Sequence, residues 1–240
     1  MSSDGTKTVL VTGATSGIGE GLVRRYASTH KVIACGRNEQ KLSALKSENV
    51  QPLRFDMTEK AQVIDAFNRV ESVDIVILNA GVCEYIDDAS SFDSSLFERV
   101  IHANVIATGY CIEALLPKIK PGGQLVVVSS SASFLPLPRA QAYGASKAAL
   151  SYLTRVMQVE LEDIDVTLVH PGFVETPLTD KNDFPMPFLV SVEKACDEIY
   201  KGVESRKREI HFPKRFTLLL KLFSLLPFSL WLPLAKRIKR

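Results

Sequence analysis

Short apolar segments alternate along the chain with longer segments whose apolar residues recur at helical spacing. Most of the short segments hold four to six residues of Val, Ile and Leu without polar alternation, which is typical of strands buried on both faces of a parallel sheet. The predicted strands are Thr8–Val11, Lys31–Cys35, Val50–Phe55, Asp74–Leu78, Gln124–Ser129, Val166–Val169 and Glu209–His211. The predicted helices are Ile18–Ser28, Asn38–Leu45, Lys60–Val70, Phe92–Leu116, Ala142–Glu162 and Val192–Glu204.

This alternation of strands and helices indicates right-handed crossover connections. We therefore expect an α/β fold, namely a Rossmann-like, doubly wound, mostly parallel seven-stranded sheet with helices on both faces. The 240 residues suffice for one domain with a well-buried core. The sequence shows no internal repeat and no low-complexity linker, so we expect a single domain over residues 1–213 and an apolar, basic tail over residues 214–240.

Composition narrows the classes of partner. The formal net charge of +2 is too small to indicate a nucleic-acid-binding surface. The four cysteines are scattered, without a CxxC pair or a Cys/His cluster, so we expect neither a metal site nor a disulfide framework. They are typical of reduced thiols in a cytosolic core, and the short polar N-terminus does not resemble a secretory signal. We expect a cytoplasmic protein whose contact with a membrane depends on the tail.

The sequence VTGATSGIGEG at residues 11–21 follows the first predicted strand. Its glycines are spaced G-x-x-x-G-x-G rather than in the commoner G-x-G-x-x-G. Gly13 would permit a sharp turn, Gly17 would let the backbone approach a pyrophosphate, and Gly19 would let the next helix pack close to the sheet. The phosphates would face the amides and positive dipole of the helix that begins near Ile18. A glycine-rich turn without a ligand is the alternative, which the position directly after the first strand disfavours.

The second predicted strand ends in VIACGRN. Dinucleotide-binding folds that prefer NAD usually place an acid here to hold the ribose 2′-hydroxyl. This chain has Gly36 followed by Arg37, and a guanidinium could instead grip a 2′-phosphate. The sequence therefore favours NADP(H) over NAD(H). An exposed arginine at the start of a helix is the alternative.

The sequence AYGASKAAL places Tyr143 and Lys147 four residues apart, on one face of a predicted helix. A phenol titrates near pH 10, but a nearby ammonium favours the phenolate, so the pair forms a plausible acid–base device. Alone the pair is a weak signal, because such surface pairs are common. Further polar groups (Asp56, Asn79, Ser130 and the sequence HPGFVETP) follow other strands, at the sheet edge where α/β folds bind ligands.

In this order and spacing, the motifs resemble the short-chain dehydrogenase/reductase superfamily in its compact single-domain form, over about residues 6–212. The resemblance places a catalytic tetrad on Asn104, Ser130, Tyr143 and Lys147. Besides Arg37, Tyr143 and Lys147, it places cofactor contacts on the glycine loop and at the ends of the third, fourth and sixth strands. These are Thr12, Gly13, Thr15, Ser16, Gly17, Ile18, Gly19, Asp56, Met57, Asn79, Ala80, Gly81, Pro171, Gly172, Val174 and Thr176.

The resemblance also implies roles for the tetrad. Tyr143 would give a proton to a carbonyl oxygen in reduction, or take one from an alcohol in oxidation. Lys147 would lower the pKa of Tyr143 and hold the nicotinamide ribose hydroxyls, while Ser130 would hydrogen-bond the substrate oxygen. Asn104 would orient a water that links Lys147 to solvent. A helix kink or a satisfied core amide is the alternative for Asn104.

The selection of Ser130 and the roles of two nearby histidines depend on the residues around them. Ser130 is flanked by Ser129 and Ser131, so its selection depends on spacing. His102 and His170 lie close to the motifs, but the tetrad already supplies acid–base chemistry and neither histidine has a metal-like partner. We interpret both as structural.

The chain departs from the superfamily in two places. The segment after Thr176 is short for a lid over the substrate, and its Phe184, Met186 and Phe188 suggest an apolar pocket wall. Relatives commonly form oligomers, so the resemblance predicts a homodimer or homotetramer. Many of them end in a glycine-rich stretch within a subunit interface, and its absence here argues against the common tetramer.

The tail KRFTLLLKLFSLLPFSLWLPLAKRIKR has three interpretations. A membrane span would need about 20 mostly apolar residues, and Lys221, Pro227 and Pro233 interrupt the run. Peripheral contact with an anionic membrane surface would use Trp231 and the terminal basic residues Lys236, Arg237, Lys239 and Arg240. Packing over the substrate cleft, or between subunits, is the third interpretation.

The sequence thus predicts an oxidoreductase that transfers a hydride between NADP(H) and a carbonyl or alcohol substrate, small to medium in size and lipophilic. An NAD(H)-dependent dehydrogenase of the same fold is one alternative. A non-catalytic NADP(H)-binding regulatory protein is another, which the complete tetrad disfavours. An epimerase or dehydratase would need a larger substrate domain than this length allows.

Overall fold

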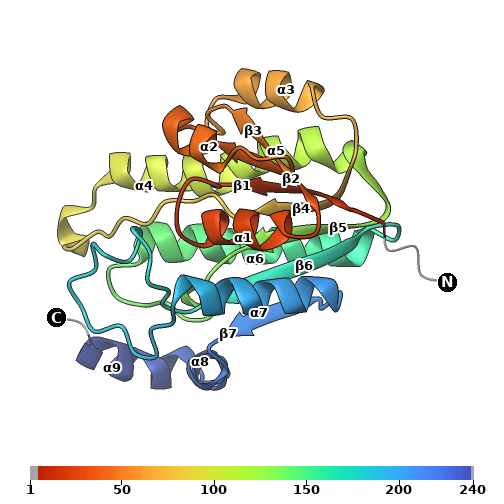
Figure 1. The fold of residues 1–240 in the computed structure, drawn as a ribbon. Helices are drawn as coiled ribbons and strands as arrows, with labels where there is room; N and C mark the ends of the chain where they lie inside the picture. Colours follow the sequence, from red (N-terminus) through yellow and green to blue (C-terminus); the bar gives the residue numbers. More distant parts are fainter. Residues whose placement is uncertain (1–4, 239–240) are drawn as a thin grey trace.

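The structure is a computed structural model that describes residues 5–238, so Lys239 and Arg240 of the basic terminus lie outside the described residues. Its centre is one seven-stranded sheet of order β3-β2-β1-β4-β5-β6-β7, with every neighbouring pair parallel (Figure 1). The strands are β1 (Thr8–Thr12), β2 (Lys31–Gly36), β3 (Val50–Arg54), β4 (Val73–Leu78), β5 (Ile119–Val128), β6 (Asp165–Pro171) and β7 (Glu209–Phe212). The predicted doubly wound α/β fold is confirmed.

Helices cover both faces of the sheet because the strands are apolar on both sides. Val9 and Val11 of β1 face the layer of α1, α2 and α7, whereas Leu10 faces the layer of α3, α5 and α6. The helices are α1 (Gly17–Ala27), α2 (Glu39–Leu45), α3 (Lys60–Asn68), α4 (Ser94–Ile101), α5 (Ala107–Leu115), α6 (Gln141–Glu160), α7 (Val192–Glu204), α8 (Lys214–Ser224) and α9 (Phe228–Ile238). Short 3₁₀ turns lie at Ala89–Ser91, Leu116–Lys118 and Ser131–Ser133.

The strand order reverses direction beside β1, since β2 and β3 lie on one side of it and β4 to β7 on the other. Such a switch point leaves a crevice at the carboxyl ends of the strands, where doubly wound sheets bind ligands. The loops after β1, β2, β4, β5 and β6 all emerge at this edge.

The prediction of one regular helix over Phe92–Leu116 is wrong in detail. Asp93 caps α4, accepting a hydrogen bond from the Leu96 amide at 2.9 Å, so the helix begins at Ser94. A π-helical turn, His102–Ile106, then separates α4 from α5. Such turns are often found at functional sites, and this one carries Asn104.

Two strands are longer than predicted by more than one residue. β5 begins at Ile119 instead of Gln124, because Ile119 already pairs with Val73 of β4, ahead of a register shift that spans the two glycines. β6 continues to Pro171, where it pairs with Phe212 of β7. This extension places the sequence HPG at the sheet edge itself.

The tail forms two helices, α8 and α9, separated at Leu225–Pro227; we call residues 214–238 the C-terminal helix pair. It lies at the lower edge of Figure 1, below the connection from β6 to α7. The indole of Trp231 is buried and donates a hydrogen bond to the Pro136 carbonyl oxygen at 3.2 Å, in the loop between β5 and α6. Around it a small apolar cluster forms from Leu135, Leu220, Phe134, Leu137, Phe216, Phe223 and Ala235. One face of the helix pair is therefore packed on the body.

Within the described part of the chain, one helical stretch, Ser94–Lys118, has the length and apolar composition that crossing a membrane requires. The core helix of a soluble protein passes the same test. This stretch contacts α6 and brings Asn104 to the sheet edge.

We predict that Trp231→Ala destabilises the protein by about 3 kcal/mol, because it empties a buried indole site and leaves the Pro136 carbonyl without its donor. The measurement is urea unfolding of the full chain. Leu230→Ala is the matched control, since Leu230 is 56% exposed on the same helix and its loss should cost under about 0.5 kcal/mol. Equal losses would show that the cluster contributes no stability.

Candidate active site

A cleft of about 450 Å³ lies at the switch point of the sheet. Its lining comes from the glycine loop, the end of β2, the loop after β3 and the end of β4. Predicted cofactor contacts within it are Thr12, Gly13, Thr15, Ser16, Gly17, Ile18, Arg37, Asp56, Met57, Asn79, Ala80, Gly81 and Thr176. The structure thus brings together residues that the sequence places on five separate segments.

The glycine loop has no room for side chains at two positions. A Cβ on Gly19 would lie 2.1 Å from the Gly13 carbonyl oxygen, and one on Gly17, at φ +53°, would lie 2.9 Å from Thr176 Cγ2. Ser16 precedes α1 as its N-cap, yet its side chain makes no capping hydrogen bond. The hydroxyl and the first amides of α1 therefore suit a pyrophosphate, as the chemistry of a dinucleotide requires.

The end of β2 has a basic and an acidic side chain. The Arg37 guanidinium, 69% exposed, lies 3.3 Å from the Asp56 carboxylate. Burial would raise the pKa of Asp56, but hydrogen bonds from Thr58 and the charge of Arg37 outweigh it and lower that pKa. Gly36 has no space for an acid, since a Cβ there would lie 2.8 Å from Thr15 Cγ2. These residues fit a nicotinamide dinucleotide, with Arg37 and Asp56 both at the end of the cleft that β2 and β3 form.

Asn79 and Ala80 tie β4 to β1. Both backbone amides donate to Thr12 Oγ1, at 3.0 and 3.2 Å, and Asn79 Nδ2 donates to the Thr12 carbonyl oxygen at 3.1 Å. These contacts hold the two strands together beside the cleft.

Tyr143 and Lys147 lie on the same face of α6. The Lys147 ammonium is 5.8 Å from the centroid of the Tyr143 ring and donates to the Val128 carbonyl oxygen at 3.0 Å. Burial lowers the pKa of Lys147 to about 8 and raises the pKa of Tyr143 well above its usual value, although a hydrogen bond with Ser130 opposes that rise. Burial dominates the pKa of Tyr143 in this structure, and the lowering expected from Lys147 stays a prediction.

The structure distinguishes Ser130 from Ser129. The Ser129 hydroxyl donates to the Lys147 carbonyl oxygen at 2.8 Å, so it is engaged with the backbone of α6. The Ser130 hydroxyl instead interacts with the Tyr143 phenol and accepts from the Ala132 amide at 3.1 Å. Its position beside the phenol supports the choice made from spacing.

Asn104 is fully buried in the π-helical turn. Its Oδ1 accepts from the Val82 amide at 2.8 Å, and its Nδ2 donates to the Val82 carbonyl oxygen and to Ser146 Oγ, both at 2.9 Å. The side chain therefore bridges the segment after β4 to α6. Asn104 is therefore a buried side-chain amide whose oxygen and nitrogen both have hydrogen-bond partners. The water-orienting role expected of it stays a prediction.

The segment between β6 and α7 forms a closed loop at the site. Its ends pair through a bridge between Val174 and Val190, and Thr176 contacts Gly17 of the glycine loop. Arg139 holds this segment near the loop after β4, since it binds Asp183 at 2.6 Å and Asp87 at 2.7 Å. Pro171 and Gly172 lie further toward the tail, where the Gly172 amide donates to the Phe212 carbonyl oxygen.

Sequence reasoning missed two residues beside the tetrad, Cys83 and Tyr85. The Cys83 side chain is hydrogen-bonded to Tyr85 and lies close enough to Tyr143 and Lys147 to affect both electrostatically. The Tyr85 ring packs edge-on against Phe184 with centroids 5.5 Å apart. Their position, directly after the Asn79–Gly81 segment, is the signal that could have identified them.

Sequence reasoning also missed a buried polar chain behind Ser130. His170 Nδ1 lies 3.1 Å from the Ser130 carbonyl oxygen, and its Nε2 lies 3.4 Å from Glu209 Oε1. Glu209 pairs with Lys221 of α8 at 2.9 Å. Burial lowers the pKa of His170 to about 4, so the ring is neutral near pH 7, and the structural role expected of it stays a prediction. In residues 5–238 no group of three or more His, Cys, Asp or Glu side chains is placed to hold a metal ion.

Comparisons with known proteins agree with this geometry. A family model described as short chain dehydrogenase matches residues 7–185. An uncharacterized oxidoreductase of Myxococcus xanthus is 33% identical over 248 residues, covering 97% of this chain and 98% of the relative. An 11-beta-hydroxysteroid dehydrogenase A of Sesamum indicum is 34% identical over 212 residues, covering 82% of this chain and 60% of the relative.

Solved structures show the same fold. A short chain dehydrogenase from Burkholderia cenocepacia in complex with NADP superposes with a TM-score of 0.81 at 25% identity, covering 93% of this chain and 99% of that one. A short chain dehydrogenase/reductase from Burkholderia phymatum in complex with NAD gives a TM-score of 0.81 at 20% identity, covering 92% and 94%. Proteins similar to this chain thus bind either nicotinamide dinucleotide.

We predict that Lys221→Met raises the pKa of His170 from about 4, because the Lys221 charge opposes protonation of the imidazole while Glu209 favours it. Glu209→Gln should lower that pKa. The measurement is a histidine NMR titration, with the His170 signal assigned from a His170→Asn variant. Shifts of the opposite sign in both variants would show that the three groups are not electrostatically linked.

Proposed function

This chain belongs to the short-chain dehydrogenase family of NAD(P)-dependent oxidoreductases, and we propose that it transfers a hydride between NADP(H) and the carbonyl or alcohol group of a lipophilic substrate of small to medium size. The observation that carries this proposal is the convergence of Ser130, Tyr143 and Lys147 from β5 and α6 beside the cleft. A phenol, a hydroxyl and an ammonium in that arrangement suit acid–base chemistry at one substrate oxygen.

When bound, a nicotinamide cofactor supplies or accepts the hydride. Tyr143 holds its proton near pH 7 because burial raises its pKa, so the phenol can donate that proton to a carbonyl oxygen during reduction. Ser130 holds the same oxygen and steadies the charge that develops on it. Lys147, which is charged below about pH 8, stabilises the tyrosinate that remains and binds ribose hydroxyls.

Three features support NADP(H) as the cofactor. Arg37 is exposed at the cleft, Gly36 excludes an acid at the end of β2, and the Ser16 hydroxyl is not used in capping. The contact between Arg37 and Asp56 favours the alternative, NAD(H), because a carboxylate there competes with a phosphate for the guanidinium. The balance favours NADP(H), since a bidentate phosphate contact is stronger than an exposed ion pair.

Aromatic side chains support a lipophilic substrate. Tyr85 packs against Phe184, Phe184 against Phe173, and Phe173 against Phe216 of α8, with ring centroids 5.5, 6.1 and 5.6 Å apart. This series begins beside Tyr143 and ends at the C-terminal helix pair. An apolar wall of this kind excludes water and accepts an apolar molecule. The steroid named for the relative from Sesamum indicum belongs to that class of substrate.

We further propose that residues 1–213 form the catalytic domain, that residues 214–240 are an accessory segment, and that the chain assembles as a homo-oligomer. Tyr152 and Val159 project from the outer face of α6 and are 77% and 84% exposed, which suits a contact between subunits. A non-catalytic regulatory role is disfavoured, because cofactor binding alone does not require the Tyr143–Lys147 pair.

We predict that Tyr143→Phe lowers kcat by about 10²- to 10⁴-fold while NADP(H) binding is kept, since the change removes the transferable proton and leaves the ring. The measurement is nicotinamide absorbance with lipophilic aldehydes, ketones and alcohols. Tyr152→Phe is the matched control, because it removes the same hydroxyl from an exposed tyrosine of the same helix. Turnover of Tyr143→Phe close to that of the wild type would refute the assignment.

We predict that Arg37→Asp weakens NADP(H) binding at least about tenfold and leaves NAD(H) binding unchanged or tighter, as loss of a charge-assisted phosphate contact of about 1.5–3 kcal/mol implies. Calorimetric titration with each dinucleotide is the measurement. Arg69→Asp serves as the control, since Arg69 pairs with Asp65 and is not part of the cleft lining. A wild-type preference for NAD(H) would mean that Asp56 rather than Arg37 governs the choice.

A further inference from the structure

We propose that the C-terminal helix pair docks on the surface of a membrane that contains anionic phospholipid. The proposal does not depend on the catalytic assignment. It follows from the exposed face of the helix pair, from the distribution of charge along the chain, and from a basic pocket at the base of α8.

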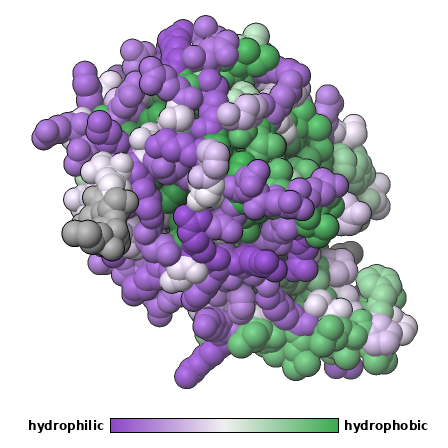
Figure 2. Space-filling model, turned by 90° about the vertical axis from the view of Figure 1, so that its right-hand side faces the viewer, coloured by the Kyte–Doolittle hydropathy of each residue, from purple (hydrophilic) through white to green (hydrophobic). Residues whose placement is uncertain are grey.

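The helix pair leaves one face uncovered. While Leu220, Trp231 and Phe223 pack inward, nine large apolar side chains of the pair are between 37% and 79% exposed. They are Leu218, Leu219, Leu222, Leu225, Phe228, Leu230, Leu232, Leu234 and Ile238, out of seventeen such side chains in the described residues. Figure 2 shows them as a mostly hydrophobic ridge along the lower edge of the molecule. A contiguous exposed patch of this kind indicates a contact surface.

Charge distinguishes a membrane from other occupants. Residues 214–240 contain seven Lys and Arg and no Asp or Glu, whereas the rest of the chain contains the other 22 Lys and Arg against 27 Asp and Glu. The positive excess of the chain therefore lies entirely in the segment that carries the apolar face. Two such tails would repel each other in a symmetric dimer, while an anionic bilayer attracts basic groups next to buried apolar side chains.

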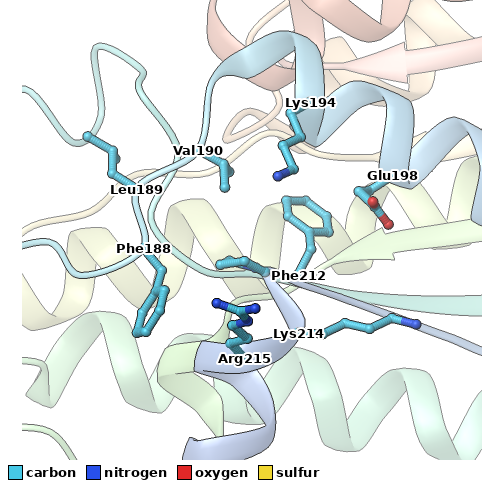
Figure 3. Close-up of a pocket in the computed structure, with 9 residues that line it drawn as sticks. Phe188, Leu189, Val190, Lys194, Glu198, Phe212, Lys214 and Arg215 are labelled. Atoms are coloured by element: carbon cyan, nitrogen blue, oxygen red, sulfur yellow. The ribbon is translucent and has the colours of Figure 1, made fainter.

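A pocket at the base of α8 fits a phospholipid headgroup. It has a volume of about 420 Å³ (Figure 3). It lies between α7, the start of α8 and the end of the segment that joins β6 to α7. Phe188, Val190 and Phe212 supply apolar walls, and Lys194 and Arg215 approach the space from opposite sides. Lys214 and the carboxylate of Glu198 line it too, so the basic groups outnumber the acid by three to one. Within the described residues neither Lys194 nor Arg215 forms an ion pair, unlike Lys221, which binds Glu209. A phosphate with an acyl chain would satisfy both the charge and the walls.

The helix pair is suited to lie on a bilayer rather than to cross it. Each helix has 11 residues, hence a length of about 16 Å at about 1.5 Å per residue, against about 30 Å of hydrocarbon. Contacts of Trp231 with Pro136 and of Lys221 with Glu209 hold the pair to the body. Its outer face can therefore enter the headgroup and acyl boundary while the catalytic domain stays outside.

Docking would also orient the active site, a consequence that rests on the proposed function. The aromatic series from Tyr85 to Phe216 ends at the inner face of the helix pair. When the outer face of the helix pair lies on a bilayer, the end of this aromatic series that is far from Tyr143 lies next to the lipid. A substrate dissolved in the membrane would then reach the site without crossing water.

The test is flotation of the full chain with vesicles of phosphatidylcholine alone or with 30% phosphatidylglycerol, a composition of about physiological charge. We expect binding to the anionic vesicles, at least tenfold weaker binding to the neutral ones, and release by salt. Leu222→Ser/Phe228→Ser should lose at least tenfold in binding with an unchanged melting temperature, because both side chains are exposed. Ile64→Ser/Phe92→Ser, a matched pair of exposed apolar residues on the body, should bind as the wild type does.

A variant that keeps the apolar face, Lys236→Gln/Arg237→Gln, tests the charge separately and should also bind less. Equal binding of wild type and Leu222→Ser/Phe228→Ser, or equal binding to both vesicle types, would overturn the proposal. Light scattering without lipid gives a further contrary outcome. If the wild type is an oligomer that Leu222→Ser/Phe228→Ser dissociates, the exposed face of the helix pair covers a second copy of the chain, and the proposal is overturned. Because flotation does not measure turnover, its failure would leave the proposed function untouched.

Discussion

The buried ammonium group of Lys147 is the constraint around which the candidate active site is arranged. The side chain is 4% exposed, and a buried charge is tolerated only where hydrogen bonds compensate its lost hydration. Val128 at the end of β5 supplies one carbonyl oxygen, and Ser129 fixes the backbone of Lys147 itself. Gly81 must stay small, since a Cβ there would lie 3.3 Å from the ammonium nitrogen and 3.0 Å from Asn104 Oδ1. The ends of β4 and β5, the π-helical turn and α6 thus meet around one charge.

Burial acts on the pKa values of Lys147 and Tyr143 in opposite directions, and near pH 7 both groups still keep their protons. It lowers the pKa of the ammonium to about 8 and raises that of the phenol, since in each case the charged form is disfavoured. Near pH 7 the phenol therefore keeps its proton while the ammonium is still charged. A proton donor next to a cation is the state that reduction of a carbonyl needs, whereas oxidation must first remove the phenol's proton.

The strands could be predicted from the sequence because burial on both faces leaves a local signal, an uninterrupted apolar run. The glycine loop and the Tyr143–Lys147 pair were predictable for a similar reason, since a few adjacent residues carry the chemistry. The π-helical turn was not predictable, because it is stabilised by contacts of Asn104 with Val82 and Ser146 that are distant in sequence. Nor could the pattern of leucines in the tail show which face is covered, since Trp231 finds its partner 95 residues away.

The C-terminal helix pair is connected to the catalytic edge by polar as well as apolar contacts. Lys221 of α8 pairs with Glu209 of β7, Glu209 faces His170 of β6, and His170 lies against the carbonyl oxygen of Ser130. On the apolar side, Phe216 stacks near Phe173 in the segment that closes over the cleft. A shift of α8 would therefore change both the electrostatic surroundings of His170 and the packing beside the substrate wall. The tail departs from the pattern expected of the family, yet its inner face is built into the same edge of the sheet as Ser130, Tyr143 and Lys147.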